Sequence, residues 1–176
     1  MRFPKLEQVA LPATFVALNP GRLHPDGSRY LPLIVLRLTG GTHLGVVDRH
    51  HRVDPARAGT AGIVRLIFQL SRIKLQPPGQ RRCGMAVPPH EQLGISVMPA
   101  ACGQIVSVLT WEQHRKLDYA SLYTELLIDI GDGTVGLRTT VTGADLTAVI
   151  GAEQLQAGDW IELTNSRIDI LEFSTQ

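Results

Sequence analysis

Short apolar runs separated by polar stretches rich in glycine and proline recur along this chain. Within the runs, apolar side chains alternate or continue for four to six residues, as in β-strands. Two pairs of runs flank glycine turns, at Gly40-Gly41 and Gly131-Asp132-Gly133, which predicts two β-hairpins. The predicted strands are 15–18, 33–38 and 43–47 in the first half, and 105–108, 124–130 and 134–137 in the second.

The last predicted strands of the two halves share one pattern at a constant spacing of 95 positions. In both, the apolar residues change parity at a Ser-Arg pair, Ser71-Arg72 and Ser166-Arg167. Because strand side chains alternate between faces, this change predicts a bulge or a turn at each pair. The shared pattern indicates a repeated unit. The matching apolar residues are Leu66, Phe68, Ile73 and Leu75 in the first half and Ile161, Leu163, Ile168 and Ile170 in the second.

One helix is predicted, in the second half. Leu146, Val149 and Ile150 form an apolar face at helical spacing, and Gly151 suits a helix C-terminus. Thr142 precedes them as an N-cap. The corresponding stretch of the first half, 53–62, contains a proline and two glycines, so its helix is expected to be short or absent.

Strand, strand, strand, helix and one or two further strands resemble the OB-fold, a five-stranded barrel with a helix between its third and fourth strands. The stretch 77–100 contains five prolines and predicts a semi-extended connector. We therefore predict a mainly β protein with two tandem OB-like barrels joined by a Pro-rich connector. The expected parts are a basic barrel at 1–76, the connector at 77–100 and an acidic barrel at 101–176.

The second half also resembles the TOBE and Mop domains, at 103–108, 125–133 and 158–163. That family binds molybdate or tungstate, or accompanies the nucleotide-binding domains of ABC importers, and paired copies are common in it. The family's ligand-binding start would fall at 98–101, where its Ser/Ala-Arg-Asn type residues do not occur. The resemblance therefore implies the fold, and an oxyanion or transporter-associated module is a third functional hypothesis.

Length and composition exclude several classes of protein, among them helical membrane proteins and disulfide-dense scaffolds. The chain has 176 residues, enough for one domain or two small ones, and no apolar run long enough to span a membrane as a helix. The N-terminus does not resemble a secretory signal, so we expect a cytoplasmic protein. Two cysteines, Cys83 and Cys102, exclude a disulfide-dense scaffold and a four-cysteine zinc site.

Charge is divided unequally between the halves. Residues 1–90 contain thirteen Lys and Arg against four Asp and Glu, whereas residues 91–176 contain four against twelve. Such asymmetry predicts either an electrostatically directed partner or attraction between the halves, and the sequence leaves both open. Arginine outnumbers lysine eleven to two in the basic half, which suits bidentate contacts to phosphate or carboxylate.

Motifs for catalysis or metal binding are weak. The G-x-G-x-x-G match at 131–136 continues into strand-like alternation, so a hairpin is predicted there in place of a dinucleotide site. His50 and His51 are adjacent, would point to opposite faces of a strand and are flanked by arginines, so no metal site is predicted. We expect no enzyme and no cofactor.

The first functional hypothesis is a non-enzymatic nucleic-acid-binding protein of the OB type, in which the basic half and connector contact the phosphate backbone. Tyr30 is the one aromatic side chain expected to stack on a base, because Phe15 and Phe68 fall in the apolar phase and are predicted to be core. The candidate residues are Arg22, Arg29, Tyr30, Arg37, Arg49, Arg52, Arg65, Arg72, Lys74, Arg81 and Arg82.

The alternative is a protein adaptor or an accessory subunit of a larger complex. Trp111, Tyr119 and Tyr123 fall in the loop expected between the first two strands of the second barrel. Exposed aromatic side chains are common anchors of protein interfaces. The competing interpretation is that Trp111 and Tyr123 close the end of the barrel.

Overall fold

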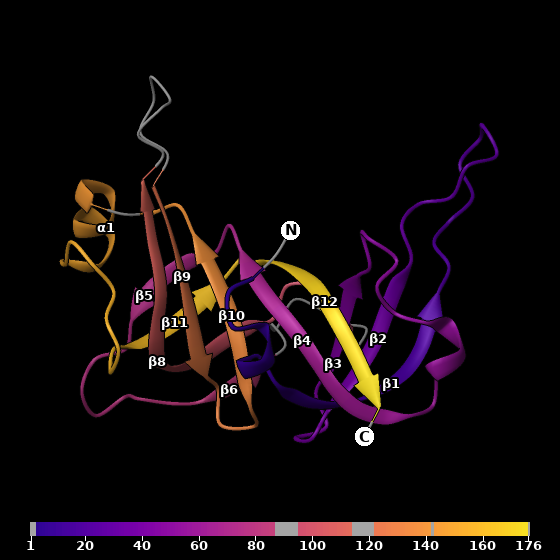
Figure 1. The fold of residues 1–176 in the computed structure, drawn as a ribbon, viewed down its shortest axis with the longest axis horizontal. Helices are drawn as coiled ribbons and strands as arrows, with labels where there is room; N and C mark the ends of the chain where they lie inside the picture. Colours follow the sequence, from indigo (N-terminus) through magenta and orange to yellow (C-terminus); the bar gives the residue numbers. More distant parts are fainter. Residues whose placement is uncertain (1–2, 87–94, 114–121, 142, 176) are drawn as a thin grey trace.

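The computed structural model describes residues 3–86, 95–113, 122–141 and 143–175. Strands dominate it, and it contains a closed five-stranded barrel with additional strands, compatible with an OB-like barrel. The prediction of a mainly β protein is therefore confirmed. Figure 1 shows the strands in one continuous arrangement, with the single described α-helix, α1 (Gly143–Ile150), at one end.

The barrel is closed because its first strand pairs on both sides. β1 pairs with β2 and also with β4, and the ring continues from β2 through β3 and β12 back to β4. The strands of this ring are β1 (Leu11–Asn19), β2 (Leu33–Leu38), β3 (His43–Val47), β12 (Arg167–Thr175) and β4 (Ala61–Gln69).

The same sheet continues beyond the barrel. β4 also pairs in parallel with β10, and the sheet then runs through β9, β8 and β11 to β5, which ends the path. The strands of this extension are β10 (Thr134–Thr139), β9 (Leu122–Asp129), β8 (Ala100–Gln113), β11 (Trp160–Thr164) and β5 (Arg72–Leu75).

Each half of the chain gives its last strand to the other half. β12 comes from the second half but lies between β3 and β4, beside which it is seen in Figure 1. β5 comes from the first half but pairs with β11. The prediction of two separate barrels, at 1–76 and 101–176, is not confirmed, because the closed barrel is completed by residues 167–175.

The two exchanged strands are paired in matching registers. In the barrel, Phe68 lies opposite Ile168, and 95 positions later along the chain Leu163 lies opposite Ile73. The neighbouring pairs keep the same spacing: Leu66 with Ile170 corresponds to Ile161 with Leu75. Apolar residues of both halves therefore meet across equivalent strand pairs.

The chain crosses between the halves at two equivalent corners. Leu70 and Asn165, 95 positions apart, both have a φ of 54°, in the left-handed region. The residues that follow them, Ser71 and Ser166, are buried, and their hydroxyls hydrogen-bond to each other at 2.8 Å. The predicted irregularity at each Ser-Arg pair is thus confirmed as a turn that redirects the chain into the other half.

Two clusters of buried apolar side chains pack against the two faces of the sheet. The larger one fills the interior and includes Phe15 and Phe68, both fully buried as predicted, and Leu146 of α1. The smaller one covers the outer face, where Phe3 and Val9 of the N-terminal segment lie over Ile67 and Leu127. This segment contains η1 (Leu6–Gln8), a short 3-10 helix.

A row of polar side chains crosses the seam where the halves meet. In register, Glu125 of β9 lies opposite Arg138 of β10, Arg138 opposite Gln69 of β4, and Gln69 opposite Arg167 of β12. The buried Glu125 carboxylate is ion-paired with Arg138. Arg167 Nη2 donates to Gln69 Oε1 at 2.7 Å and to Asp169 Oδ2 at 3.0 Å.

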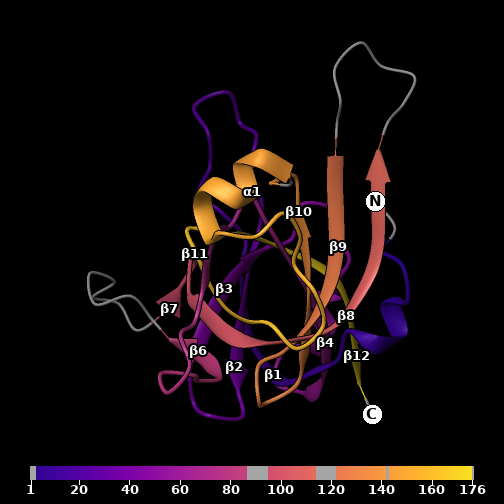
Figure 2. The same cartoon turned by 90° about the vertical axis from the view of Figure 1, so that its left-hand side faces the viewer.

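The predicted helix is present, whereas the Pro-rich connector is not confirmed, because described parts of it form paired strands. α1 lies above the second-half strands (Figure 2), while the first half has only the 3-10 turn η2 (Pro55–Arg57) at the corresponding place. Within 77–100, β6 (Gly84–Ala86) pairs with β8 and β7 (Ile95–Ser96) with β3. The connector is therefore tied to the sheet at both ends, and residues 87–94 lie outside the described part.

The two left-handed corners provide a matched test of backbone strain. Leucine in this conformation costs roughly 1 to 2 kcal/mol, whereas asparagine tolerates it and glycine adopts it freely. Leu70, which is 70% exposed, makes few contacts that its removal would forfeit. We expect Leu70→Gly to raise the free energy of unfolding by about 1 kcal/mol and Asn165→Gly to leave it nearly unchanged. Urea unfolding of both variants measures this, and a destabilised Leu70→Gly would contradict it.

Candidate nucleic-acid interface

The connection between β1 and β2 is an ordered arm that projects from the barrel (Figure 1). Its two sides are joined by a bridge between Leu23 and Arg29 and by a hydrogen bond from the Tyr30 amide to the Arg22 carbonyl at 3.0 Å. At the tip, the hydroxyl and amide of Ser28 donate to Asp26, and these bonds lower the pKa of that carboxyl. The arm is therefore held by its own backbone and side chains.

Tyr30 lies near the base of this arm with its ring accessible. The residue is 57% exposed, and the His24 ring contacts one side of it with centroids 4.5 Å apart. Arg29 donates from Nη1 to the Gly21 carbonyl at 3.3 Å. Gly21 is required at this point, since a Cβ there would lie 2.3 Å from the Tyr30 carbonyl oxygen and its φ is 78°.

The connection between β3 and β4 is organised by one buried carboxylate. Asp48, 1% exposed, accepts hydrogen bonds from the amides of Arg52 and Val53 at 2.9 and 3.0 Å, and a longer one from His50 at 3.4 Å. These hydrogen bonds hold the loop in a bent conformation in which His51 and Arg52 are exposed. Asp54 then caps η2 by accepting from the Ala56 amide.

These two connections enclose a cavity of about 630 Å³ at one end of the barrel. Arg29, Tyr30 and Arg52, three of the predicted interface residues, line it together with His51. His51 was not among the predicted interface residues, although the unusual run of histidines and arginines at 48–52 marks it in the sequence. Asp48 and Asp54 also line the cavity, but both accept hydrogen bonds from backbone amides.

Three predicted phosphate-binding arginines instead form ion pairs with the acidic half. Arg49 Nε lies 3.4 Å from Asp169, Arg65 Nε 3.6 Å from Glu172, and Arg82 Nη2 3.2 Å from Glu162. Of the two alternatives left open by the charge asymmetry, attraction between the halves accounts for these residues. Each pair contributes at most about 1 kcal/mol where it is exposed, but none of the three presents an uncompensated charge.

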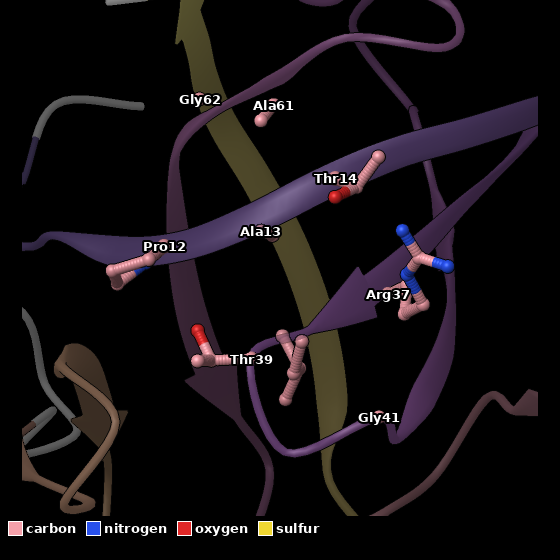
Figure 3. Close-up of a pocket in the computed structure, with 9 residues that line it drawn as sticks. Pro12, Ala13, Thr14, Arg37, Thr39, Gly41, Ala61 and Gly62 are labelled. Atoms are coloured by element: carbon pink, nitrogen blue, oxygen red, sulfur yellow. The ribbon is translucent and has the colours of Figure 1, made fainter.

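The remaining predicted residues are dispersed. Arg22 is exposed on the arm. Arg37 lines a separate cavity of about 600 Å³ beside β1 and β2, where Figure 3 shows its side chain near Thr14. Arg72 and Lys74 lie on β5, at the opposite end of the sheet path. Arg81 lies over the Trp160 ring, with its guanidinium carbon 5.7 Å from the centroid. A single continuous basic groove through all eleven residues is therefore not formed.

The predicted protein-interface residues fall partly outside the described residues. Trp111 lies on β8 and Tyr123 on β9, which pair with each other. The prediction that these two residues belong to the loop between the strands is therefore wrong. Tyr119 belongs to the stretch 114–121, which the structure does not describe.

The two cysteines are both free thiols. Burial raises the pKa of the Cys102 thiol, and the neighbouring Arg82 acts in the opposite direction. A hydrogen bond with Cys102 is the main cause that raises the pKa of Arg82. Within the described ranges, no cluster of three or more His, Cys, Asp or Glu side chains is placed to hold a metal ion.

Comparisons with known proteins give no relative. No family model matches the chain, and no curated protein or solved structure is significantly similar to it. Among the described residues, no helix is long and apolar enough to cross a membrane.

The role assigned to Asp48 predicts a large effect of its removal. Asp48→Ala would leave the amides of Arg52 and the buried Val53 without their acceptor, and we expect it to lower the free energy of unfolding by about 2 to 3 kcal/mol. Asp54→Ala, the matched control on the same loop, removes one exposed cap and should cost about 1 kcal/mol. Chemical unfolding of the two variants measures the difference, and equal effects would show that Asp48 does not organise the loop.

Proposed function

We propose that this protein binds single-stranded nucleic acid at the end of the barrel where the β1–β2 arm meets the β3–β4 connection. The observation that carries the proposal is the shared cavity of Arg29, Tyr30, His51 and Arg52. It combines an exposed aromatic ring with two guanidinium groups that form no ion pair among the described residues. Single-strand binders use this combination of stacking platform and phosphate contacts.

In this proposal one base stacks on the accessible face of Tyr30, whose other side is supported by His24. Arg29 and Arg52 contact the phosphates on either side of that base, and Arg22 extends the contact along the arm. One stacking ring supplies little sequence preference, since every base has a π-face. Binding is therefore directed at the backbone and falls steeply as salt rises, because each neutralised phosphate releases counterions.

We also infer that the chain is a duplicated OB-like unit whose copies have exchanged their last strands. Three features at a spacing of 95 support this: the equivalent registers of β4–β12 and β11–β5, the left-handed corners at Leu70 and Asn165, and the Ser71–Ser166 hydrogen bond. OB-folds bind ligands with the loops that join their strands. The arm corresponds to the loop between the first two strands of an OB-fold, and the β3–β4 connection, which stands where an OB-fold has its helix, lines the same cavity.

The proposal is tested by fluorescence anisotropy with a labelled oligothymidylate at low salt. An Arg29→Glu, Arg52→Glu double variant is expected to bind at least tenfold more weakly, since it replaces two phosphate contacts by repulsion. Tyr30→Ala is expected to lose about 5-fold or more, corresponding to one stacked base. Arg65→Gln is the matched control: it removes an arginine paired with Glu172 and should bind as the unaltered protein does.

Two results would refute this function. One is the absence of binding by the unaltered protein at low salt. The other is an unchanged affinity in the double variant, which would place the contact elsewhere on the molecule.

A protein-binding adaptor is the second candidate, favoured by the apolar side chains on the same arm. Leu23 is 62% exposed and Leu31 is 42% exposed, beside Tyr30. Exposed aromatic and arginine residues also form hot spots of protein interfaces. Pull-down from a nuclease-treated lysate separates the two: a partner retained after nuclease and lost in Leu23→Ser supports the adaptor, and recovery only without nuclease contradicts it.

A further inference from the structure

The free edge of β5 borders a cavity of about 590 Å³ that has no part in the interface proposed above. Four consecutive residues line it, Ser71, Arg72, Ile73 and Lys74. Since successive strand residues point to opposite faces, a cavity reached by all four runs along the edge of the strand. Val141 and Val149 form its opposite wall, beside and on α1, which lies next to β5.

The cavity exists because the second half does not close its ring as the first half does. In the barrel, β12 pairs with β4 on one side and with β3 on the other. The equivalent strand β5 pairs with β11 on one side, and on its other side the described strands supply no partner. β10, which corresponds to β3, pairs with β4 instead. Because β10 pairs with β4, it does not cover the outer edge of β5, and the cavity lies along that edge.

The exchanged strand of the other copy shows what the repeated arginine does. Arg167, equivalent to Arg72, donates to the carboxylate of Asp169, which is 91% buried at its side chain, and to the amide oxygen of Gln69. Asp169 also accepts from Gln69 Nε2 at 2.7 Å and lies 3.4 Å from Arg49. In that copy the protein's own carboxylate, that of Asp169, therefore neutralises the repeated arginine.

In the first copy the corresponding anion is replaced by a cation. The residue equivalent to Asp169 is Lys74, and the residue equivalent to Gln69 is Thr164, which also lines the cavity. Neither Arg72 nor Lys74 forms an ion pair within the described part of the chain. Glu162, opposite Lys74 on β11, is held by Arg82 at 3.2 Å. The edge of β5 thus carries two positive charges without an internal counterpart.

The rest of the lining suits a ligand that is anionic at one end and apolar at the other. The hydroxyls of Ser71 and Thr164 can each donate a hydrogen bond to a ligand. The Ser71 proton is available because Ser166 is the donor in the Ser71–Ser166 hydrogen bond. Two cations and two hydroxyls match a phosphate dianion better than a carboxylate, which would leave one positive charge unneutralised. Val141 and Val149 offer apolar surface to such a ligand, and Val149 is 57% exposed, whereas Ile73 is buried in the core.

We infer that this cavity binds a phosphate monoester carried on an apolar group, whose phosphate supplies to Arg72 and Lys74 the negative charge that Asp169 supplies to Arg167 in the other copy. The inference is independent of nucleic-acid binding at the arm, because it uses different residues at the other end of the sheet. Arg72 and Lys74, which the sequence predicted to contact the phosphate backbone of a nucleic acid, here bind a small ligand.

The test is titration of the full chain with phenyl phosphate, followed by amide chemical shifts in two-dimensional NMR spectra. We expect shift changes to be concentrated at 71–74, Val141 and Val149, and inorganic phosphate to bind at the same residues more weakly because it has no apolar group. Lys74→Asp recreates the internal anion of the other copy and is expected to weaken phenyl phosphate binding about tenfold or more, the loss of a charge-assisted contact. Lys74→Gln is the milder variant if Lys74→Asp disturbs the fold.

Arg37→Gln is the matched control, since it removes an exposed arginine of the same half that lines a different cavity, and its affinity should be unchanged. Shift changes centred on Arg29 and Arg52, no binding of phenyl phosphate, or equal binding by Lys74→Asp and the unaltered protein would each overturn the inference. Oligothymidylate binding by Lys74→Asp is measured in parallel. Its retention together with lost phenyl phosphate binding shows that the two sites are separate, and its loss would overturn that separation.

Discussion

The exchange of the two last strands is the constraint on which the rest of this molecule depends. The closed barrel lacks one of its five strands until residues 167–175 are in place, and β5 has no partner until β11 has formed. At the crossing, the buried Ser166 hydroxyl donates to the buried Ser71 hydroxyl, so neither is left without a partner; an unpaired buried hydroxyl costs about 1 to 3 kcal/mol. Neither half can therefore complete its sheet alone, and the two halves are expected to unfold together.

The same exchange explains how the opposite charges of the halves are used. Asp169 and Glu172 are carried by β12 into the basic half, where Arg49 and Arg65 lie near them. Glu162 meets Arg82 where β5 leads into the connector. Much of the asymmetry is thus neutralised within one chain. The arginines without such a partner among the described residues are then the informative ones, and they include Arg29 of the β1–β2 arm, Arg52 of the β3–β4 connection, Arg37 of β2 and Arg72 of β5.

The two proposed sites lie at separate places in the fold, one at the end of the barrel beside the β1–β2 arm and one at the edge of β5. The first half has a long, self-supported arm between its first two strands, and this arm brings Tyr30 to the end of the barrel. The second half lacks strand pairing at β5, because β10 has joined β4.

The alternation of apolar residues by itself predicted most of the strands, both glycine hairpins, the single helix and the turns at Ser71 and Ser166, because side-chain periodicity and turn chemistry are local properties. It also placed Phe15 and Phe68 in the core. It did not predict β6, β7 or the full length of β8. Which strand pairs with which was decided by tertiary structure, since Phe68 packs equally well beside an apolar strand from either half. The sequence therefore predicted two separate barrels and a basic groove. Only the exchange of β5 and β12 determined that Arg49, Arg65 and Arg82 face carboxylates, whereas Arg29 and Arg52 share a cavity with Tyr30.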